Sequence, residues 1–289
     1  MFEDVAKKTK YMVYTRKFDR ECRIADLVDT ETIERLSTHF EYHGYEGGES
    51  IAGLGALHAD AIPDGMHVTI LMDMSGSMQG RPISQTCYGV LAATLALEEA
   101  GASVEVLGYT TTDSNGPLEA FNGDRTVTHP GRLSALLHVI AKEPGVPAAR
   151  SAGSILAMAT KGLHRENLDG EAIIWASKRL AAKPGTDKAL VLVTDGVEPY
   201  CAVTERFAGD RRVMKAHLKA VVDEIQAGGE INFTPVIVDN FWGSHDQDTY
   251  VSPVWTKFDA ADVARAIGEA VSQSLVPAAE SNPARGPKV

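Results

Sequence analysis

Three oxygen-bearing side chains follow an apolar stretch in the segment ILMDMSGSMQGRPI (70–83). Asp73, Ser75 and Ser77 stand at alternate positions and form the motif D-x-S-x-S. One carboxylate and two hydroxyls supply hard oxygen donors, which suit Mg²⁺, Mn²⁺ or Ca²⁺ better than metals that prefer sulfur. Gly76 would let the turn fold tightly enough for both hydroxyls to face one point. The spacing favours a cation site, with an ordinary polar turn as the alternative.

Two other kinds of site that follow a strand fit these residues less well. A phosphate-binding P-loop needs GxxxxGK[ST], and an arginine and a proline (Arg81 and Pro82) stand where its lysine and hydroxyl would be. A nucleophile elbow needs GxSxG, whereas Ser75 lies in DMSGS. The nine histidines form no HExxH motif. Nucleotide hydrolysis and acyl transfer are therefore weaker interpretations than cation binding.

A second apolar segment, KALVLVTDG, also ends in an aspartate, Asp195. Two strand ends can lie side by side in a doubly wound sheet, which would bring Asp195 into the same crevice as Asp73. Between the two segments, the polar turn RENLDGEA opens a helix. Its Asn167 and Asp169 are suited to capping that helix, and equally to supplying a further oxygen ligand.

Alternating strands and helices from Met66 onward would position these residues. Strands are expected at 67–73, 103–110, 188–196 and 231–239, and helices at 81–101, 210–229 and 259–275. Pro82 in the first turn and Gly101 at the end support the first of these helices. Short apolar strands between amphipathic helices predict an α/β fold with a doubly wound, mostly parallel sheet, covered on both faces.

The first part of the chain has a different pattern, and residues 1–65 are predicted to form an N-terminal accessory segment and linker. Within it, KYMVYTRKF (10–18) is a candidate extended segment, and residues 24–44 show helical spacing. The Gly-rich stretch GYEGGESIAGLGALH is expected to be a loop or linker. Residues 66–276 would form the main domain, and the Pro-rich residues 277–289 a disordered tail.

Composition narrows the class of protein. Hydrophobic content of 44% and charged content of 23% are those of an ordinary soluble globular protein. The formal net charge of -11 argues against broad binding to nucleic acid or to an anionic membrane. Cys22, Cys87 and Cys201 are far apart and form no CxxC, which indicates free, buried thiols. The start has no apolar signal core and no apolar run approaches about 18 residues, so a cytoplasmic protein is expected.

The motif DMSGSM, followed by TDG after a second strand, resembles the von Willebrand factor A domain with its metal-ion-dependent adhesion site (MIDAS). Several longer segments resemble the C-terminal part of the T subunit of aerobic cobaltochelatase: DMSGSMQGRPI, VEVLGYTT, PGRLSALLHVI, HRENLDGEAIIWASKRL and SHDQDTYV. YMVYTRKFD resembles the segment that precedes that domain. The resemblance runs with gaps from Tyr11 to Leu275, and ENLDGEAIIWA is its most family-specific part.

The resemblance implies a set of oxygen ligands for a divalent cation, namely Asp73, Ser75, Ser77, Asp169 and Asp195. Asp195 would act in the outer shell through water. The wider superfamily has a threonine as the middle ligand, where the turn in this chain offers Asn167, Asp169 and Glu171. Asp169 is preferred, and it would make the site more negative and the cation more tightly bound. Mg²⁺ is the expected ion, with Mn²⁺ or Ca²⁺ as alternatives.

The resemblance implies an adaptor rather than a catalyst, so no catalytic residue is expected. In that family the subunit assembles with an AAA+ ATPase subunit and engages a large chelatase subunit that holds the corrin-ring precursor. ATP hydrolysis then drives cobalt insertion during cobalamin biosynthesis. The bound ion would keep one position open for a glutamate or aspartate of a partner. No nucleic-acid or membrane partner is expected.

The alternative is a von Willebrand factor A adaptor of a MoxR-type AAA+ ATPase that remodels another protein. It predicts the same metal site but no chelatase large subunit. An adhesion module is disfavoured by the missing export signal and the free cysteines, and an inert domain would show no cation effect. T subunits also carry a further N-terminal region and a long acidic tract that this sequence lacks, which predicts a short version or a fragment.

Overall fold

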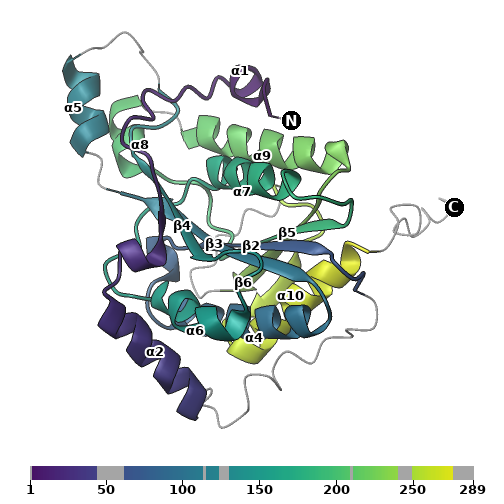
Figure 1. The fold of residues 1–289 in the computed structure, drawn as a ribbon. Coiled ribbons are helices and arrows are strands. Elements are labelled where there is room, and N and C mark those ends of the chain that lie inside the picture. The colour runs from purple at the N-terminus through teal and green to yellow at the C-terminus, as the bar shows by residue number, and fades with distance from the viewer. Residues whose placement is uncertain are drawn as a thin grey trace, which may run out of the picture.

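Within the described residues, seven strands form one sheet with helices on both of its faces (Figure 1). The computed structural model describes residues 2–43, 62–112, 115–123, 130–208, 211–239 and 249–275. The sheet has the strand order β1-β4-β3-β2-β5-β6-β7. The strands are β1 Arg20–Arg23, β2 His67–Asp73, β3 Ser103–Thr111, β4 Leu136–Lys142, β5 Lys188–Thr194, β6 Asn232–Asp239 and β7 Val254–Lys257.

The predicted α/β fold with a mostly parallel sheet is confirmed. Strands β3, β2, β5, β6 and β7 are parallel neighbours. Strand β4 runs antiparallel to β3, and β1 pairs in parallel with β4. Sequence reasoning did not predict the reversed pair, because it assigned no strand to the residues that form β4. The reversed strands lie at one edge, so the central strands keep the parallel arrangement expected for the site.

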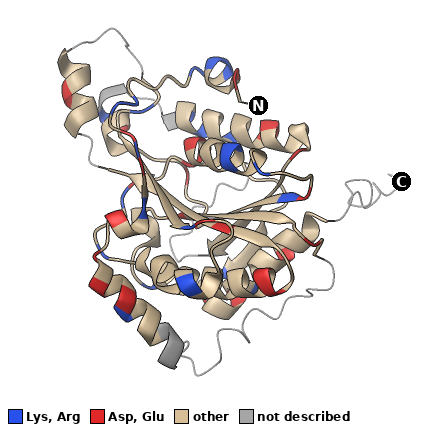
Figure 2. Ribbon diagram, viewed as in Figure 1, with Lys and Arg blue, Asp and Glu red and all other residues tan. Residues whose placement is uncertain are grey.

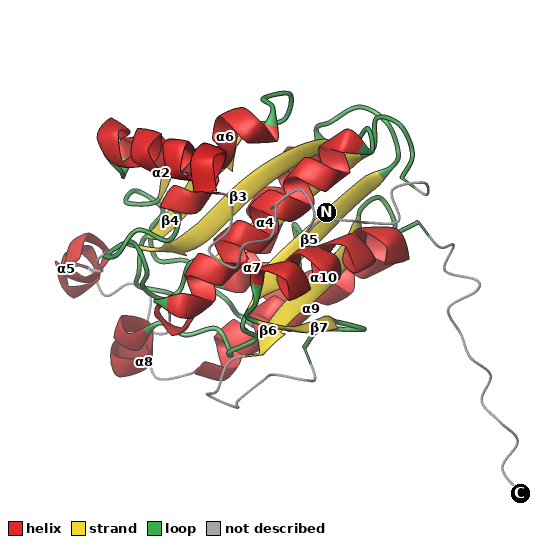
Figure 3. Ribbon diagram, turned by 90° about the horizontal axis from the view of Figure 1, so that it is seen from below, coloured by secondary structure: helices red, strands yellow, loops and turns green. Residues whose placement is uncertain are grey.

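The helices cover the two faces of the sheet (Figures 1 and 3). One face carries α2 Thr30–His43, α4 Arg81–Glu99, α6 Ala148–Ala157 and α10 Ala260–Gln273. The other carries α1 Val5–Thr9, α7 Asp169–Ala181 and α9 Arg211–Gly228. The remaining α-helices of the described residues are α5 Asn115–Gly123 and α8 Ala202–Ala208. The three predicted helices at 81–101, 210–229 and 259–275 are confirmed as α4, α9 and α10.

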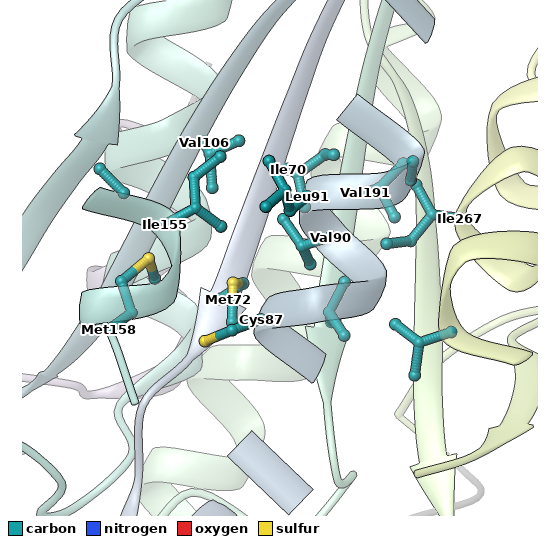
Figure 4. Packing of buried hydrophobic residues seen from close by; sticks show 14 of the residues in the cluster. Ile70, Met72, Cys87, Val90, Leu91, Val106, Ile155, Met158, Val191 and Ile267 are labelled. Atoms are coloured by element: carbon teal, nitrogen blue, oxygen red, sulfur yellow. The ribbon is translucent and has the colours of Figure 1, made fainter. Parts of the chain in front are cut away.

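Strand β2 is buried on both sides, because its alternate side chains enter two different cores. Ile70 and Met72 belong to the cluster beneath the sheet, together with Val90 and other α4 residues (Figure 4). Leu71 points the other way, into the cluster formed with α7 and α9. A strand covered on both faces reads as a continuous apolar run, which is why the sequence predicts it well.

The accessory segment is joined to the main domain. The expected extended segment at 10–18 forms no strand: among the described residues, its β-type contact is an isolated bridge between Val13 and Arg132. The first strand begins later, at β1, which is an edge strand of the same sheet. Tyr11 is held by its side chain, with its ring stacked 3.9 Å from that of His217. The domain boundary after residue 65 stays a prediction, and the predicted linker and tail lie outside the described residues.

The predicted helix at 24–44 begins later than expected. Residues Ile24–Asp26 form a 3₁₀ turn, and α2 starts at Thr30. The carboxylate of Asp29 accepts a hydrogen bond of 2.8 Å from the backbone N–H of Thr32, as residues before a helix often do. The helix itself is confirmed.

The structure locates the surface charges and the three cysteines. Figure 2 shows Lys and Arg interspersed with Asp and Glu along the outer helices. In the described part of the chain, no helix has the length and apolarity to cross a membrane. All three cysteines are free, and Cys87 and Cys201 are buried. Cys22 is only partly buried, because it lies on edge strand β1, so its predicted burial is wrong.

Candidate metal centre

The candidate ligands lie where the central strands end. Strand β2 pairs in parallel with β5, so Asp73 at the end of β2 and Asp195 just after β5 reach the same edge of the sheet. On the other side of β2, strand β3 places Tyr109 opposite Asp73. The prediction that these two strands end side by side, at β2 and β5, is confirmed.

Asp73 is fully buried and both of its carboxylate oxygens accept hydrogen bonds. The backbone N–H of Ser75 donates to Oδ1 at 2.8 Å, and the hydroxyl of Thr194 donates to Oδ2 at 2.8 Å. The hydroxyl of Thr194 in turn accepts from the N–H of Gly196 at 3.2 Å. Sequence reasoning assigned Thr194 no role, although its position beside Asp195 at a strand end could have indicated one.

The electrostatics of Asp73 disfavour an isolated negative charge. Burial raises its pKa well above the ordinary value, and the charges of Asp195 and Asp169 raise it further. The hydrogen bonds from Thr194 and Ser75 lower it only in part. A nearby positive charge would stabilise the ionised form. The position therefore suits a carboxylate that binds a cation.

The two serines converge on one point. A 3₁₀ turn, η3 (Gly76–Met78), follows Ser75, and the hydroxyl oxygens of Ser75 and Ser77 are 3.0 Å apart. The N–H of Gly76 donates to the carbonyl of Arg165 at 2.5 Å, and a Cβ at Gly76 would lie 3.2 Å from that oxygen. The close approach of the serine turn to the loop at Arg165 explains why a glycine stands at position 76. Ser75 is buried, whereas Ser77 is partly exposed and lines a cavity of about 670 Å³.

Asp169, the preferred middle ligand, is the first residue of α7 and is fully buried. The hydroxyl of Tyr109 donates to its Oδ1 at 2.8 Å, and that of Tyr250 to its Oδ2 at 3.1 Å. Burial raises the pKa of Asp169 to about 6, although the two tyrosines act in the opposite direction. Sequence reasoning missed both tyrosines. Tyr109 stands at a strand end, which is a weak signal, and Tyr250 has no local signal.

The other two residues offered by this turn have different contacts. The side-chain amide of Asn167 donates to the carbonyl of Val197 at 3.0 Å and so joins the two loops. Leu168 is the N-cap of α7, which has no side-chain capping bond, so of the two alternatives for Asn167 and Asp169 the capping one is wrong. The turn is instead held by contacts to other loops.

Glu171, the last alternative for the middle ligand, belongs to a buried ion cluster. Its carboxylate contacts the guanidinium of Arg132, the hydroxyl of Tyr11 at 2.8 Å and Arg16 at 2.5 Å. Burial alone would raise its pKa, but Arg132 and Arg16 hold the pKa at about 2. Arg132 is 1% exposed and also donates to the carboxylate of Asp19, through Nη1 at 2.9 Å and Nη2 at 2.5 Å. Glu171 is thus committed to this cluster.

The donor set fits a small, hard cation. Within the described ranges, no group of three or more His, Cys, Asp or Glu side chains is arranged to hold a metal ion. The site instead presents one buried carboxylate, Asp73, and the paired hydroxyls of Ser75 and Ser77 beside an open cavity. Mg²⁺ commonly binds one or two carboxylates and completes its shell with water or with oxygens from another molecule. The residues present therefore fit the ion that the resemblance implies.

Solved structures that resemble this chain include two pilus proteins and a conserved hypothetical protein of bacteria. The pilus adhesin SpaC from Lactobacillus rhamnosus GG is 12% identical, with a TM-score of 0.46, and the match covers 74% of this chain and 30% of the adhesin chain. The protein BatB from Bacteroides thetaiotaomicron is 14% identical, with a TM-score of 0.40 and coverage of 73% and 98%. A mutant of the PilB minor pilin from Streptococcus sanguinis is 11% identical, with a TM-score of 0.48 and coverage of 77% and 64%. At such low TM-scores, these structures do not inform function.

The match to a protein family is more specific. A family model described as the cobalamin biosynthesis protein CobT VWA domain matches residues 58–272, which is more than half of the chain. The matched region contains every candidate ligand and both central strands. It confirms the resemblance to a von Willebrand factor A domain of the cobaltochelatase T subunit type. The chain belongs to the family of cobalamin biosynthesis protein CobT VWA domains.

Proposed function

We propose that this chain is the adaptor subunit of an aerobic cobaltochelatase-like complex, in which it couples an AAA+ ATPase to the insertion of cobalt into the corrin ring. Its family already indicates involvement in cobalamin biosynthesis. One observation supports the adaptor role above all others. The buried carboxylate of Asp73 lies beside two further acidic residues and is followed by two converging hydroxyls at the mouth of a cavity.

In this proposal Asp73, Ser75 and Ser77 would hold Mg²⁺ directly, and Asp195 would act through water. Asp169 is the proposed middle ligand, and its two tyrosine partners fix the orientation of its carboxylate. When bound, the ion would offer a coordination position to a carboxylate of the ATPase subunit. The accessible side of the site is the cavity at Ser77, since Asp73 itself is fully buried. ATP hydrolysis and cobalt insertion are assigned to the partner subunits.

The test is affinity capture from a lysate of the source organism, with ATP and Mg²⁺ present throughout. Three baits are compared: the wild type, Asp73→Asn and Asp223→Asn. A chelator is avoided because it would also remove Mg²⁺ from the ATP of the partner. Asp223 is a matched control, since it is an exposed aspartate on α9 whose carboxylate lies 2.9 Å from the ammonium of Lys219 on the same helix. Captured proteins are identified by mass spectrometry.

Recovery of an AAA+ ATPase and a large chelatase subunit by the wild type and Asp223→Asn, but not by Asp73→Asn, would support the proposal. Recovery of an AAA+ ATPase without the large subunit would favour the MoxR-type adaptor instead. If Asp73→Asn captured both partners as well as the wild type does, the metal-bridged contact would be wrong.

A further inference from the structure

A cavity of about 670 Å³ opens directly beside Ser77. Its wall includes Gly76 and Gly80 from the serine turn and Lys161 and His164 from the loop after α6. Its volume lies within the range of about 300 to 1,000 Å³ that is typical of ligand pockets. Because Ser77 is a candidate metal ligand, anything that occupies this cavity would lie next to the proposed contact with the partner.

The wall of the cavity is held in place by contacts to the site itself. Arg165 follows His164 in the sequence. Its carbonyl accepts a hydrogen bond of 2.5 Å from the N–H of Gly76, and its own N–H donates one of 3.1 Å to the hydroxyl of Thr110. The ring nitrogen Nε2 of His164 lies 3.0 Å from the carbonyl of Met158. The loop that carries Lys161 is therefore fixed to the serine turn at one end and to the end of α6 at the other.

The part of the cavity wall formed by the serine turn lets a polypeptide come close. Gly80 has a φ of +89°, a conformation that side-chain-bearing residues rarely adopt, and nothing lies within 4 Å of where its Cβ would be. Gly76 also carries no side chain. At Gly80, the backbone of a partner segment can therefore approach the serine turn closely, beside the exposed side chain of Gln79.

The charge of the cavity differs from that of the adjacent site. Lys161 is exposed and forms no ion pair with any described residue. Burial lowers the pKa of His164, so this ring is neutral near pH 7 and Lys161 is the charged residue of the cavity wall. A chain with a formal net charge of -11 thus presents a positive side chain beside a site that would hold a cation. An acidic segment complements both.

We propose that the cavity accepts a second acidic side chain of the partner segment whose first carboxylate binds at the metal site, and that Lys161 recognises this second acid. The proposal rests on the proposed adaptor function and adds the chemistry of the partner: two acidic residues close together, rather than one. Lys161 is then a specificity-determining residue of the contact.

The test measures binding of short, fluorescently labelled peptides to the full chain in Mg²⁺ by anisotropy. Each probe is a capped, Gly-rich peptide with one glutamate and a second glutamate one, two or three residues later. Each is paired with a peptide that has glutamine at the second position. The proteins are the wild type, Lys161→Gln, Asp73→Asn and a control, Lys178→Gln, whose exposed lysine lies on α7 across the sheet.

We expect at least one two-glutamate peptide to bind the wild type about two- to fivefold more tightly than its glutamine partner, because exposed ion pairs contribute little. Lys161→Gln should remove this advantage, and Lys178→Gln should keep it. The inference is overturned if the second glutamate adds nothing at any spacing, or if its advantage persists in Lys161→Gln, even while Asp73→Asn still weakens the peptides. If Asp73→Asn does not change the affinity for the peptides, the proposed adaptor function is wrong, and this inference is wrong with it.

Discussion

Asp73 is completely buried and has acidic neighbours, and both disfavour its ionised form unless a cation is nearby. We expect Asp73→Asn to leave the free energy of unfolding unchanged or slightly increased without divalent ions, because the variant removes a charge beside Asp195 and Asp169. With Mg²⁺ at one hundred times its Kd, the wild type should gain about 2.7 kcal/mol and the variant nothing. Thermal unfolding with and without Mg²⁺ measures both effects. An equal Mg²⁺ effect on the wild type and the variant would contradict the assignment of Asp73 as a ligand.

Arg132 is the second residue whose surroundings predict a large effect. Its guanidinium is buried between Glu171 and Asp19, and all three belong to distant parts of the chain. Arg132→Met should destabilise the protein by about 3 to 5 kcal/mol, because it leaves the carboxylate of Glu171 buried without its main partner. Urea unfolding checks the value.

A matched double variant, Arg132→Met with Glu171→Gln, should recover part of this loss, since it removes the uncompensated charge. If Arg132→Met cost no more than an exposed ion pair, below about 1 kcal/mol, the cluster would contribute little to stability.

At the scale of elements, α7 connects the candidate site with the N-terminal segment. Its first residue, Asp169, accepts hydrogen bonds from Tyr109 and Tyr250, whereas Glu171, two positions later, binds Arg132 and Tyr11. The first turn of α7 is therefore fixed from two directions. This explains how the N-terminal segment supports the site without contributing a candidate ligand.

The contact between α2 and α6 gives a prediction at the same scale. A Cβ at Gly153 on α6 would lie 2.2 Å from Oγ of Ser37 and 2.3 Å from the carbonyl of Ile33, both on α2. Gly153→Ala should destabilise the protein by about 1 to 3 kcal/mol through overpacking and should reduce hydrogen-exchange protection in α2. The control is Gly123→Ala in α5, where nothing lies within 4 Å of the added Cβ. Equal effects of the two substitutions would refute the close helix contact.

For the molecule as a whole, the N-terminal segment and the main domain meet at a ring pair that makes stability depend on pH. His217 on α9 stacks on Tyr11, and burial lowers its pKa from 6.5 to about 4, with Glu171 raising and Arg16 lowering it. As the pH falls, His217 is therefore protonated in the unfolded chain before it is protonated in the folded protein. The contribution of His217 is complete above pH 6.5 and is lost as the pH falls toward 4, by about 1.4 kcal/mol per pH unit at most.

The measurement is the free energy of unfolding of the wild type and His217→Phe from pH 7 to pH 4.5. Below pH 6.5 the wild type should lose stability more steeply than the variant, which keeps a ring against Tyr11 but cannot be protonated. Other groups titrate equally in both proteins. The larger phenylalanine ring can change the free energy of unfolding by a constant amount, but this does not change the difference between the two slopes against pH. Parallel curves would show that His217 is not the cause.

The sequence by itself determined the central strands and the position of the candidate site. Strands β2 and β5 are buried on both faces and so read as short apolar runs, and parallel neighbours must end at one edge of the sheet. Asp73, Ser75, Ser77 and Asp195 could therefore be placed together from their spacing and from the strands they follow. Their role as metal ligands stays a prediction.

Only the tertiary structure decided which side chains surround these residues. The bonds from Tyr250 to Asp169 and from Arg132 to Asp19 join positions 81 and 113 residues apart, and no local pattern records such pairs. A buried arginine has the same sequence signal as an exposed one, because its burial depends on partners that folding brings to it. The reversed direction of β4 was likewise settled by pairing with β3, since a strand's own residues do not specify the direction of its neighbour.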